Sequence, residues 1–319
     1  MTGFILRRLL AAVGVLWAMT LVIFAIVHIL PGNVAYAILG EYATPAAVAV
    51  LEQKLRLNDP LPVQYWHWLR ALLHGDFGQS LVMERPAAPV ILEALERSAV
   101  LAGISFVLVA SGGILLGIYA ATHRGQWPDK LLMVGQFLFI AVPDFFWSIL
   151  AILLFASWLH WLPATGYAPL ESDGVLVWAA HLVMPVCVLS AGLIAHVCRL
   201  TRSSMLEVLE SRYILAARAK GLPERLVLHR HALPNALLPT ITILAIDAGL
   251  LIGGVVVVET VFAYPGLGRL LVFAIEHHDL PLLQAGMIVL TAIYALANLT
   301  ADVGYALLNP RIRYGRRAA

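Results

Sequence analysis

Long apolar runs dominate this sequence, and they constrain its fold more than any other feature. The run from Leu9 to Leu30 would extend about 33 Å as a helix, enough to cross the roughly 30 Å hydrocarbon core of a bilayer. Charged residues make up 13% of the 319-residue chain, about half of their share in soluble domains. The sequence therefore predicts an all-α polytopic membrane protein with six transmembrane helices, at about 9–30, 99–121, 131–159, 178–197, 237–258 and 282–308.

The most polar part of the chain lies between the first two predicted spans, at residues 33–97. Short helical patterns at 45–55 and 62–73 are followed by the motif HGDFGQS, which begins at His74. Trp66 and Trp68 indicate a folded segment rather than a linker. We expect four parts: a retained N-terminal span (1–32), a small extracytoplasmic domain (33–97), a core of five spans (98–308) and a basic cytoplasmic tail (309–319).

The distribution of positive charge predicts the orientation in the membrane. With the N-terminus inside, fifteen of the 21 Lys and Arg residues are cytoplasmic, which agrees with the excess of such residues in the cytoplasmic loops of membrane proteins. The other six lie outside: Lys54, Arg56, Arg70, Arg85, Arg97 and Arg269. We therefore expect a multi-pass protein whose N- and C-termini are both cytoplasmic.

A basic interruption at about 201–236 separates the fourth and fifth predicted spans. Apolar residues recur every three to four positions, as in an amphipathic helix from 204 to 220, at Leu206, Leu209, Tyr213 and Ala216 or Ala217. Gly221 can end this helix in a left-handed conformation, and Pro223 suits the start of a second helix that runs to Ala232. Two short helices joined at a glycine would form a compact knob that can transmit a push from another subunit.

The spacing of residues in this interruption resembles that of a known cytoplasmic loop. Ala216, Ala217, Gly221, Leu233 and Pro234 follow the order A-A-x3-G-x11-L-P, which is similar to the ATPase-coupling loop (the EAA loop) in membrane subunits of bacterial ABC importers. The glutamate that is usual in that loop is replaced by Leu215. Peptide-importer branches commonly lack this glutamate as well, so Leu215 favours a resemblance to those branches over the other importers.

Motifs along the whole chain extend the resemblance to the dipeptide, oligopeptide and nickel permease family of ABC importers. They are ILRRLL at Ile5, HILPG at His28, HGDFGQS at His74, TRSSMLEVL at Thr201, ETVFAYPGLGRL at Glu259 and NPRIR at Asn309. The resemblance implies a MetI-like permease fold in the bacterial inner membrane. It also implies a paralogous permease as partner, two cytoplasmic ABC ATPases and an extracytoplasmic solute-binding protein, with no nucleic-acid partner.

The absence of catalytic motifs agrees with that resemblance. The sequence has no G-x4-G-K-[ST] phosphate loop, so ATP and Mg are expected on the partner ATPases, with no cofactor and no catalytic residue on this chain. It has neither H-E-x-x-H nor G-x-S-x-G. The histidine pairs at 229 and 231 and at 277 and 278 are more typical of solvated or capping residues than of metal ligands.

Two carboxylates within the predicted spans are candidates for the translocation path. A carboxylate that faces lipid at mid-depth costs about 2.5–3.5 kcal/mol, so Asp247 should face a cavity, a partner or another polar side chain. It either lines the path or makes a structural hydrogen bond where two permeases meet. Asp144, which follows Pro143, is the second candidate.

These features bear on three classes of function. The first is the permease subunit of an ATP-driven importer for di- or oligopeptides, with nickel or a metal chelate as the alternative substrate. The second is an ion-coupled secondary transporter with Asp247 and Asp144 as proton sites, which would work from this chain alone. The third is a membrane hydrolase, for which the sequence offers no nucleophile or metal constellation.

Overall fold

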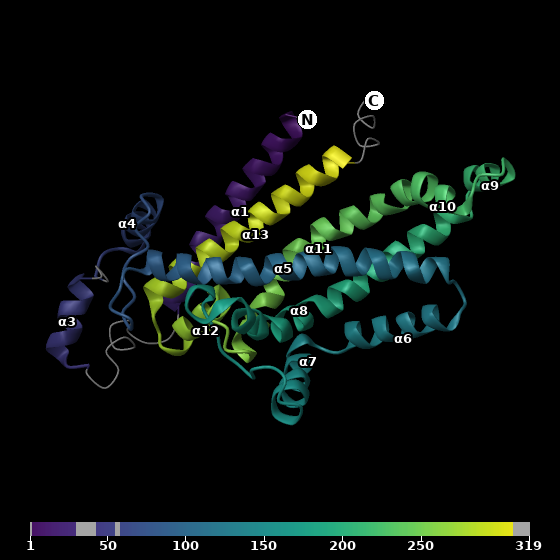
Figure 1. The fold of residues 1–319 in the computed structure, drawn as a ribbon. Coiled ribbons are helices and arrows are strands. Elements are labelled where there is room, and N and C mark those ends of the chain that lie inside the picture. The colour runs from purple at the N-terminus through teal and green to yellow at the C-terminus, as the bar shows by residue number, and fades with distance from the viewer. Residues whose placement is uncertain (1, 30–42, 55–57, 309–319) are drawn as a thin grey trace. The chain divides into compact units, whose positions relative to one another are not determined.

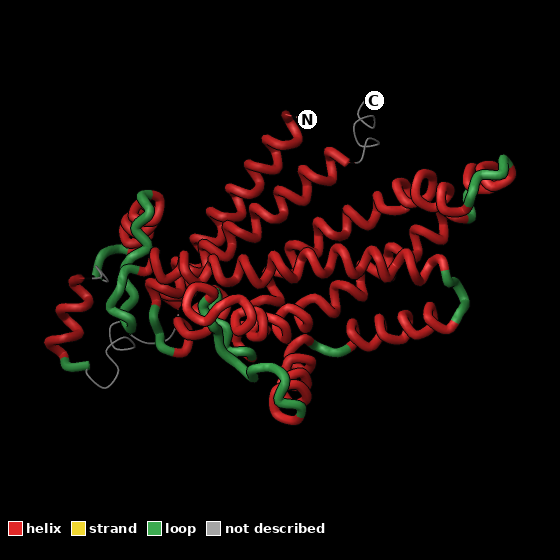
Figure 2. Tube along the Cα trace, in the orientation of Figure 1, coloured by secondary structure: helices red, strands yellow, loops and turns green. Residues whose placement is uncertain are grey.

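The computed structural model describes residues 2–29, 43–54 and 58–308. Helices account for nearly all of the ordered structure (Figures 1 and 2), and within the described ranges the only β-pairing is one isolated bridge between Gln79 and Pro86. Five of the described helices are long and apolar enough to cross a membrane, and there are six such segments if the bent pair Trp127–Ala141 and Asp144–Trp158 is counted as one broken span. This confirms the prediction of an all-α, six-span protein. The predicted tail at 309–319 and most of the HILPG motif lie outside the described residues.

The chain divides into two compact units, and residues 1–98 and 265–296 form unit 1. Its helices are α1 (Thr2–Ile29), α3 (Pro45–Lys54), α4 (Leu61–Leu73), the start of α5 (Ala87–Thr122), α12 (Leu267–Glu276) and most of α13 (Leu280–Leu308). Helix α4 contacts α1: the hydroxyls of Thr20 and Tyr65 share a 2.8 Å hydrogen bond, and Phe24 packs against Tyr65 and Trp68.

A small apolar core joins the two sequence segments of unit 1. Its buried residues come from the start of α5, from α12 and from the start of α13, and include Ile91, Leu267 and Leu282. Residues 87–98, predicted as the end of an extracytoplasmic domain, are therefore the first turns of a helix that continues through the second span. The segment between the fifth and sixth predicted spans also contains a helix, α12, whose apolar residues Leu267, Leu271 and Ala274 are buried.

The HGDFGQS motif is fixed to the start of α13 by Asp279, which is fully buried. The Ser80 hydroxyl donates to the Asp279 carboxylate, which also accepts from the backbone N–H groups of Val82 and Leu282, each at 3.3 Å. Asp279 thus caps the N-terminus of α13 and at the same time accepts hydrogen bonds from Ser80 and Val82 in the turn. The motif therefore has a structural role, because it connects the segment before α5 to the start of α13.

Loss of this carboxylate should destabilise the protein. We expect Asp279→Ala to lower the free energy of unfolding by about 2–3 kcal/mol, because three donors lose a buried acceptor. The midpoint of thermal unfolding of the detergent-solubilised complex measures this. Asp76→Ala is the matched control, since Asp76 is exposed and accepts only a local bond from the Gly78 N–H. Equal midpoints for the two variants would contradict the prediction.

Unit 2 contains residues 99–264, together with 297–319. It holds the rest of α5, then α6 (Trp127–Ala141), α7 (Asp144–Ala151), the π-helix η2 (Ile152–Trp158) and α8 (Leu170–Leu209). After these come α9 (Arg212–Ala219), α10 (Glu224–Leu226), the π-helix η3 (Val227–Ala232) and α11 (Leu233–Val261). Buried residues of α8 and α11, such as Leu189, Leu251 and Val258, form the main core.

Close approach of α5 to α8 depends on small residues. A Cβ at Gly117 would lie 2.5 Å from the Thr201 side chain and 2.8 Å from the Cys198 carbonyl oxygen. No side chain fits at those distances, so the backbone of α5 at Gly117 packs directly against the Thr201 side chain of α8. Packing through small residues is how transmembrane helices associate without a hydrophobic driving force.

The third predicted span, 131–159, is broken rather than straight. Helix α6 ends at Ala141, and α7 with η2 continues at an angle of 105° to it. Pro143 explains the break, because the residue before a proline avoids helical geometry, and Val142 is extended at φ −105° and ψ 129°. Helix α8 is also longer than predicted. It begins before the predicted start at 178, includes Glu171–Gly174, and kinks at Gly174.

Candidate functional site

The coupling segment, residues 201–236, contains the last turns of α8, the helices α9, α10 and η3, and the start of α11. Its first part does not form the single helix that was predicted. Helix α8 ends at Leu209, and α9 begins at Arg212. Ser211 separates them in an extended conformation at φ −70° and ψ 151°, while its hydroxyl donates to the Val208 carbonyl at 2.5 Å. Serine competes with helical backbone hydrogen bonds in this way, so the predicted helix from 204 to 220 is two helices.

This break shifts which side chains of α9 face inward. The uninterrupted pattern placed Tyr213 on the buried face, but Tyr213 is 45% exposed and Ile214 is fully buried. Ala217 is buried as well, whereas Ala216 is exposed. Ile214 and Ala217 pack with Met205, Val227 and other residues into a small core of the coupling segment. Helix α9 is thereby held firmly against the ends of α8 and α11.

The turn after α9 has the predicted left-handed glycine. Gly221 has a φ of +74°, and its N–H donates to the Arg218 carbonyl at 2.9 Å. The predicted second short helix, 224–232, is not separate from the fifth span. Helices α10, η3 and α11 form one continuous helix, Glu224–Val261. The turn at Gly221 is therefore attached directly to the start of a transmembrane helix.

Side-chain contacts across the turn add to its rigidity. Arg218 donates to both carboxylate oxygens of Glu224, at 2.6 and 3.0 Å, which raises the pKa of the Arg218 guanidinium. The Asn235 amide donates to the Tyr213 hydroxyl at 3.2 Å and to the His231 carbonyl at 3.0 Å. A bidentate pair and a bridging amide hold α9 at a fixed angle to the helix that follows.

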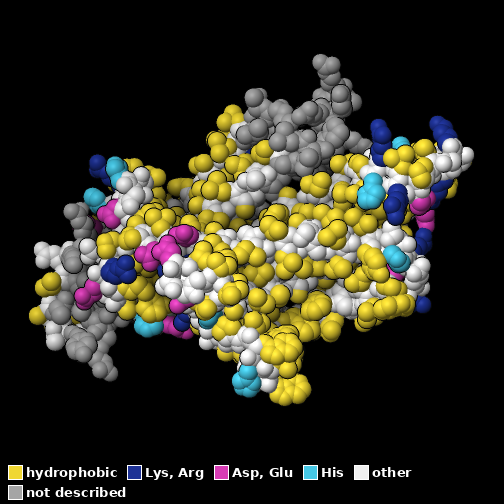
Figure 3. Space-filling view, viewed as in Figure 1, with side chains coloured by type: hydrophobic (Ala, Val, Ile, Leu, Met, Phe, Trp, Pro, Cys, Tyr) yellow, Lys and Arg dark blue, Asp and Glu magenta, His cyan; other side chains and the backbone are white. Residues whose placement is uncertain are grey.

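The residues of the A-A, G, L-P spacing fall into two groups in the structure. Ala217 is buried and Leu233 packs against the same core, so both serve the fold. Leu215 (55% exposed), Ala216, Gly221 and Pro234 are exposed. In Figure 1, α9 lies at the end of unit 2 where α8 ends and α11 begins, and in Figure 3 Lys and Arg gather around it. The exposed group forms a candidate contact surface for another subunit.

Asp247 lies on α11 and is fully buried. Its two carboxylate oxygens lie 3.1 and 3.3 Å from Nδ1 of His196 on α8, whose side chain is 34% exposed. Asp144 is half-buried at the start of α7, and its Oδ2 would lie 3.7 Å from a Cβ at Gly254 of α11. Two turns of α11, about 10 Å, separate the levels of Asp247 and Asp144, so they do not form one site.

The sequence interpretation missed His196, and it counted Arg202 only as a cytoplasmic cation. Arg202 makes a buried ion pair with Asp129 of α6, with Nε to Oδ1 at 2.6 Å and Nη2 to Oδ2 at 2.8 Å. The sequence did offer a signal for His196, because a histidine in the fourth apolar run could be expected to pair with the acid Asp247 in the fifth. Nothing in the sequence paired Asp129 with Arg202, because 73 residues separate them.

Comparison with known proteins identifies the family. Residues 113–314 match the family described as binding-protein-dependent transport system inner membrane component, and residues 1–101 match the N-terminal part of such membrane components. The chain belongs to this family. It is an ABC importer permease, a multi-pass inner-membrane subunit that is not itself an enzyme.

Relatives of this permease match it over nearly its whole length. A probable peptide ABC transporter permease, y4tP of Sinorhizobium fredii, is 39% identical over 98% of this chain and 99% of its own. The dipeptide transport permease DppB of Alkalihalophilus pseudofirmus is 37% identical, and the glutathione transport permease GsiC of Salmonella typhimurium is 38% identical. Each of these two matches covers 98% of this chain and 100% of the relative.

Proposed function

We propose that this permease forms half of the translocation path of an ATP-driven importer for di- or oligopeptides. The observation that carries the proposal is the full-length similarity to permeases named for peptides, dipeptides and the tripeptide glutathione. The relatives described above give no support to nickel as a substrate. The other half of the path comes from a paralogous permease, and a solute-binding protein delivers the peptide.

The coupling segment supports an ATPase partner on the side where α9 lies. Its exposed residues Leu215, Ala216 and Gly221 form a surface on a rigid turn that leads directly into α11. A docking ATPase subunit can push such a turn and move the transmembrane helix with it, whereas a flexible loop would absorb the movement. Alternating access then follows: ATPase closure moves the coupling segment, and the spans tilt to open the path outward and afterwards inward.

Reconstitution tests the function directly. The four membrane and ATPase subunits are placed in proteoliposomes with the binding protein, and uptake of a radiolabelled dipeptide and of ⁶³Ni²⁺ is compared with and without ATP. We expect dipeptide uptake only with ATP. Uptake by this chain alone, driven by a proton gradient, would instead support the ion-coupled alternative with Asp247 and Asp144 as proton sites.

The proposed orientation has its own test. A cysteine at Gln53, an exposed position of α3, should react with a membrane-impermeant maleimide in intact spheroplasts, in a chain whose native cysteines are replaced by serine. A cysteine at the exposed Lys220 is the matched control and should react only after lysis. The reverse pattern would place the coupling segment outside the cell and overturn the proposal.

A further inference from the structure

Helix α6 buries two polar side chains and exposes most of its large apolar ones. Its buried residues are Asp129 and Gln136. Apart from Lys130 near its start, its large exposed side chains are apolar, and they include Trp127, Leu131, Val134, Phe137 and Leu138. In a bilayer these apolar side chains contact lipid tails, which are as favourable a surrounding as another helix. The hydrophobic effect therefore contributes little to holding α6 against α8, and the association depends on van der Waals packing and on polar contacts between the two helices.

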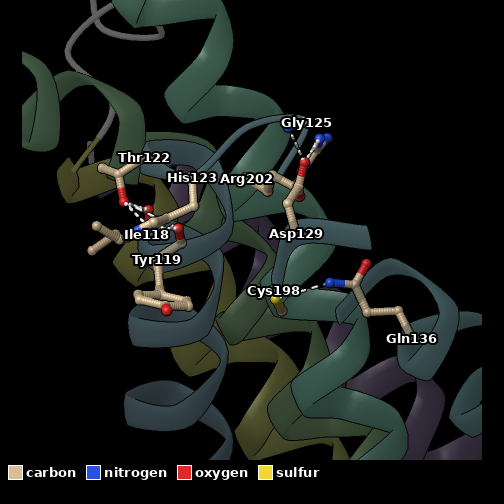
Figure 4. Close-up of polar contacts among 9 residues, drawn as sticks. All are labelled: Ile118, Tyr119, Thr122, His123, Gly125, Asp129, Gln136, Cys198 and Arg202. Carbon is tan, nitrogen blue, oxygen red and sulfur yellow. Dashed lines mark hydrogen bonds and ion pairs between the residues drawn. The ribbon is translucent and has the colours of Figure 1, made fainter. Parts of the chain in front are cut away.

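The first of these contacts is the Asp129–Arg202 pair (Figure 4). Besides the two bonds from Arg202, the carboxylate accepts the Gly125 N–H at 2.9 Å, and the Asp129 side chain is 1% exposed. A bidentate guanidinium–carboxylate pair fixes orientation as well as distance. Removal of Arg202 would leave the buried Asp129 carboxylate without its counter-charge. The pair is thus a rigid link between the start of α6 and the last two turns of α8.

The second contact joins the same two helices further along (Figure 4). The Gln136 amide donates to the Cys198 sulfur at 2.9 Å, and both side chains are buried. Moving seven residues forward on α6 corresponds to moving four back on α8, so the helices are antiparallel and both contacts lie along one seam. Together they restrain the rotation of α6 as well as its distance from α8.

This seam connects the coupling segment with the bend in the third span. Arg202 lies at one end, about two turns before α8 ends at Leu209 and is followed by Ser211 and α9. At the other end, α6 stops at the 105° bend at Val142 and Pro143. Beyond the bend, Asp144 of α7 lies against Gly254 of α11. A displacement of the end of α8 can therefore be transmitted to the bend through the Asp129–Arg202 and Gln136–Cys198 contacts.

We propose that Asp129 and Arg202 are positioning residues for transport. Their ion pair, supported by the Gln136–Cys198 contact, makes α6 move as one body with the C-terminal part of α8. The displacement of the coupling segment then reaches the bend at Pro143 and helps to open or close the path. This inference rests on the proposed function, because it needs an ATPase that moves the coupling segment.

The experiment measures dipeptide uptake per ATP hydrolysed by the complete reconstituted importer at saturating binding protein. In Arg202→Met, we expect uptake per ATP to fall at least fivefold while the ATPase rate stays within twofold of wild type, because the coupling segment still moves but α6 does not follow. Arg202→Lys keeps the charge but not the bidentate geometry, and should give an intermediate ratio. Arg124→Met is the matched control. It removes an ion pair with Glu210 that is mostly exposed, and it should leave the ratio unchanged.

A milder pair of variants keeps the test valid if Arg202→Met does not assemble. Cys198→Ala removes the acceptor of the Gln136 amide, whereas Cys198→Ser retains an acceptor. We expect about a twofold loss of uptake per ATP in the first and none in the second. If the contacts only hold the fold together, the yield of complex will fall while uptake per ATP in the assembled fraction stays at the wild-type value. That result would overturn the inference.

Wild-type behaviour separates this inference from the function on which it rests. If the wild-type importer shows no ATP-dependent dipeptide uptake, the proposed function fails. If the wild type is coupled and Arg202→Met keeps both its assembly and its uptake per ATP, the proposed function stands and the role of the Asp129–Arg202 pair is refuted. A parallel fall of ATPase activity and uptake also refutes it, because the pair would then act on the ATPase contact.

Discussion

Gly221→Val should leave the permease inserted and assembled but abolish the stimulation of ATPase activity by the substrate-loaded binding protein, and dipeptide uptake should fall at least tenfold. No heavy atom lies within 4 Å of a Cβ built at Gly221, so the substitution creates no clash. Valine at a φ of +74° is strained by about 1–2 kcal/mol, because its Cβ lies too close to the following carbonyl oxygen. The backbone can relieve this strain by rotating to negative φ, which changes the angle between α9 and α10 and moves the exposed surface away from its partner.

A second glycine provides the matched control for that experiment. Gly174 has a φ of +79°, again with no atom within 4 Å of a built Cβ, and it lies at the start of α8, away from the coupling segment. Gly174→Val imposes the same backbone strain and should keep both stimulated ATPase activity and uptake. Normal stimulation in assembled Gly221→Val would contradict the proposed role of the turn. Failure of both variants to assemble would show that the strain acts on folding.

Asp247→Asn should leave the four-subunit complex assembled and selectively reduce the transport of cationic peptides. The substitution keeps the size and a hydrogen-bond acceptor for His196 Nδ1, and removes the charge. If the buried pair sets the electrostatic potential of the path, uptake of a lysine-containing dipeptide should fall about fivefold to tenfold relative to dialanine, which corresponds to roughly 1–1.4 kcal/mol. Competitive uptake of the two labelled dipeptides measures this ratio.

His196 determines how that result is interpreted. Asp247 is fully buried and His196 is 34% exposed on its side chain, so the imidazole is the accessible end of the pair. His196→Asn should therefore lower the ratio of lysine-dipeptide to dialanine uptake less in the Asp247→Asn variant than in the wild type. This is the result expected for two sites that are energetically coupled. Asp173→Asn, a change at an exposed carboxylate of α8, should leave the uptake ratio unchanged. Equal loss of both dipeptides, or loss of the partner permease on purification, would favour a structural role for Asp247.

The sequence by itself determined the class of fold and predicted where the candidate coupling segment begins and ends. Apolar length decides whether a segment can cross a bilayer, so five of the predicted spans overlap long apolar helices, and the third predicted span corresponds to the bent pair. Chemistry local to a few residues also decided the turn at Gly221, because a left-handed backbone after an amphipathic helix favours glycine. The family followed from the motif spacing along the chain.

Only the tertiary structure decided how these elements meet. The helix break at Ser211 depends on a side-chain contact that competes with the helical pattern, and it exchanged Tyr213 for Ile214 on the buried face. The pairs His196–Asp247 and Asp129–Arg202 join residues that are 51 and 73 positions apart. Apolar periodicity carries no information about them, because it does not record which polar side chains on different helices meet, and those partners are set by packing in three dimensions.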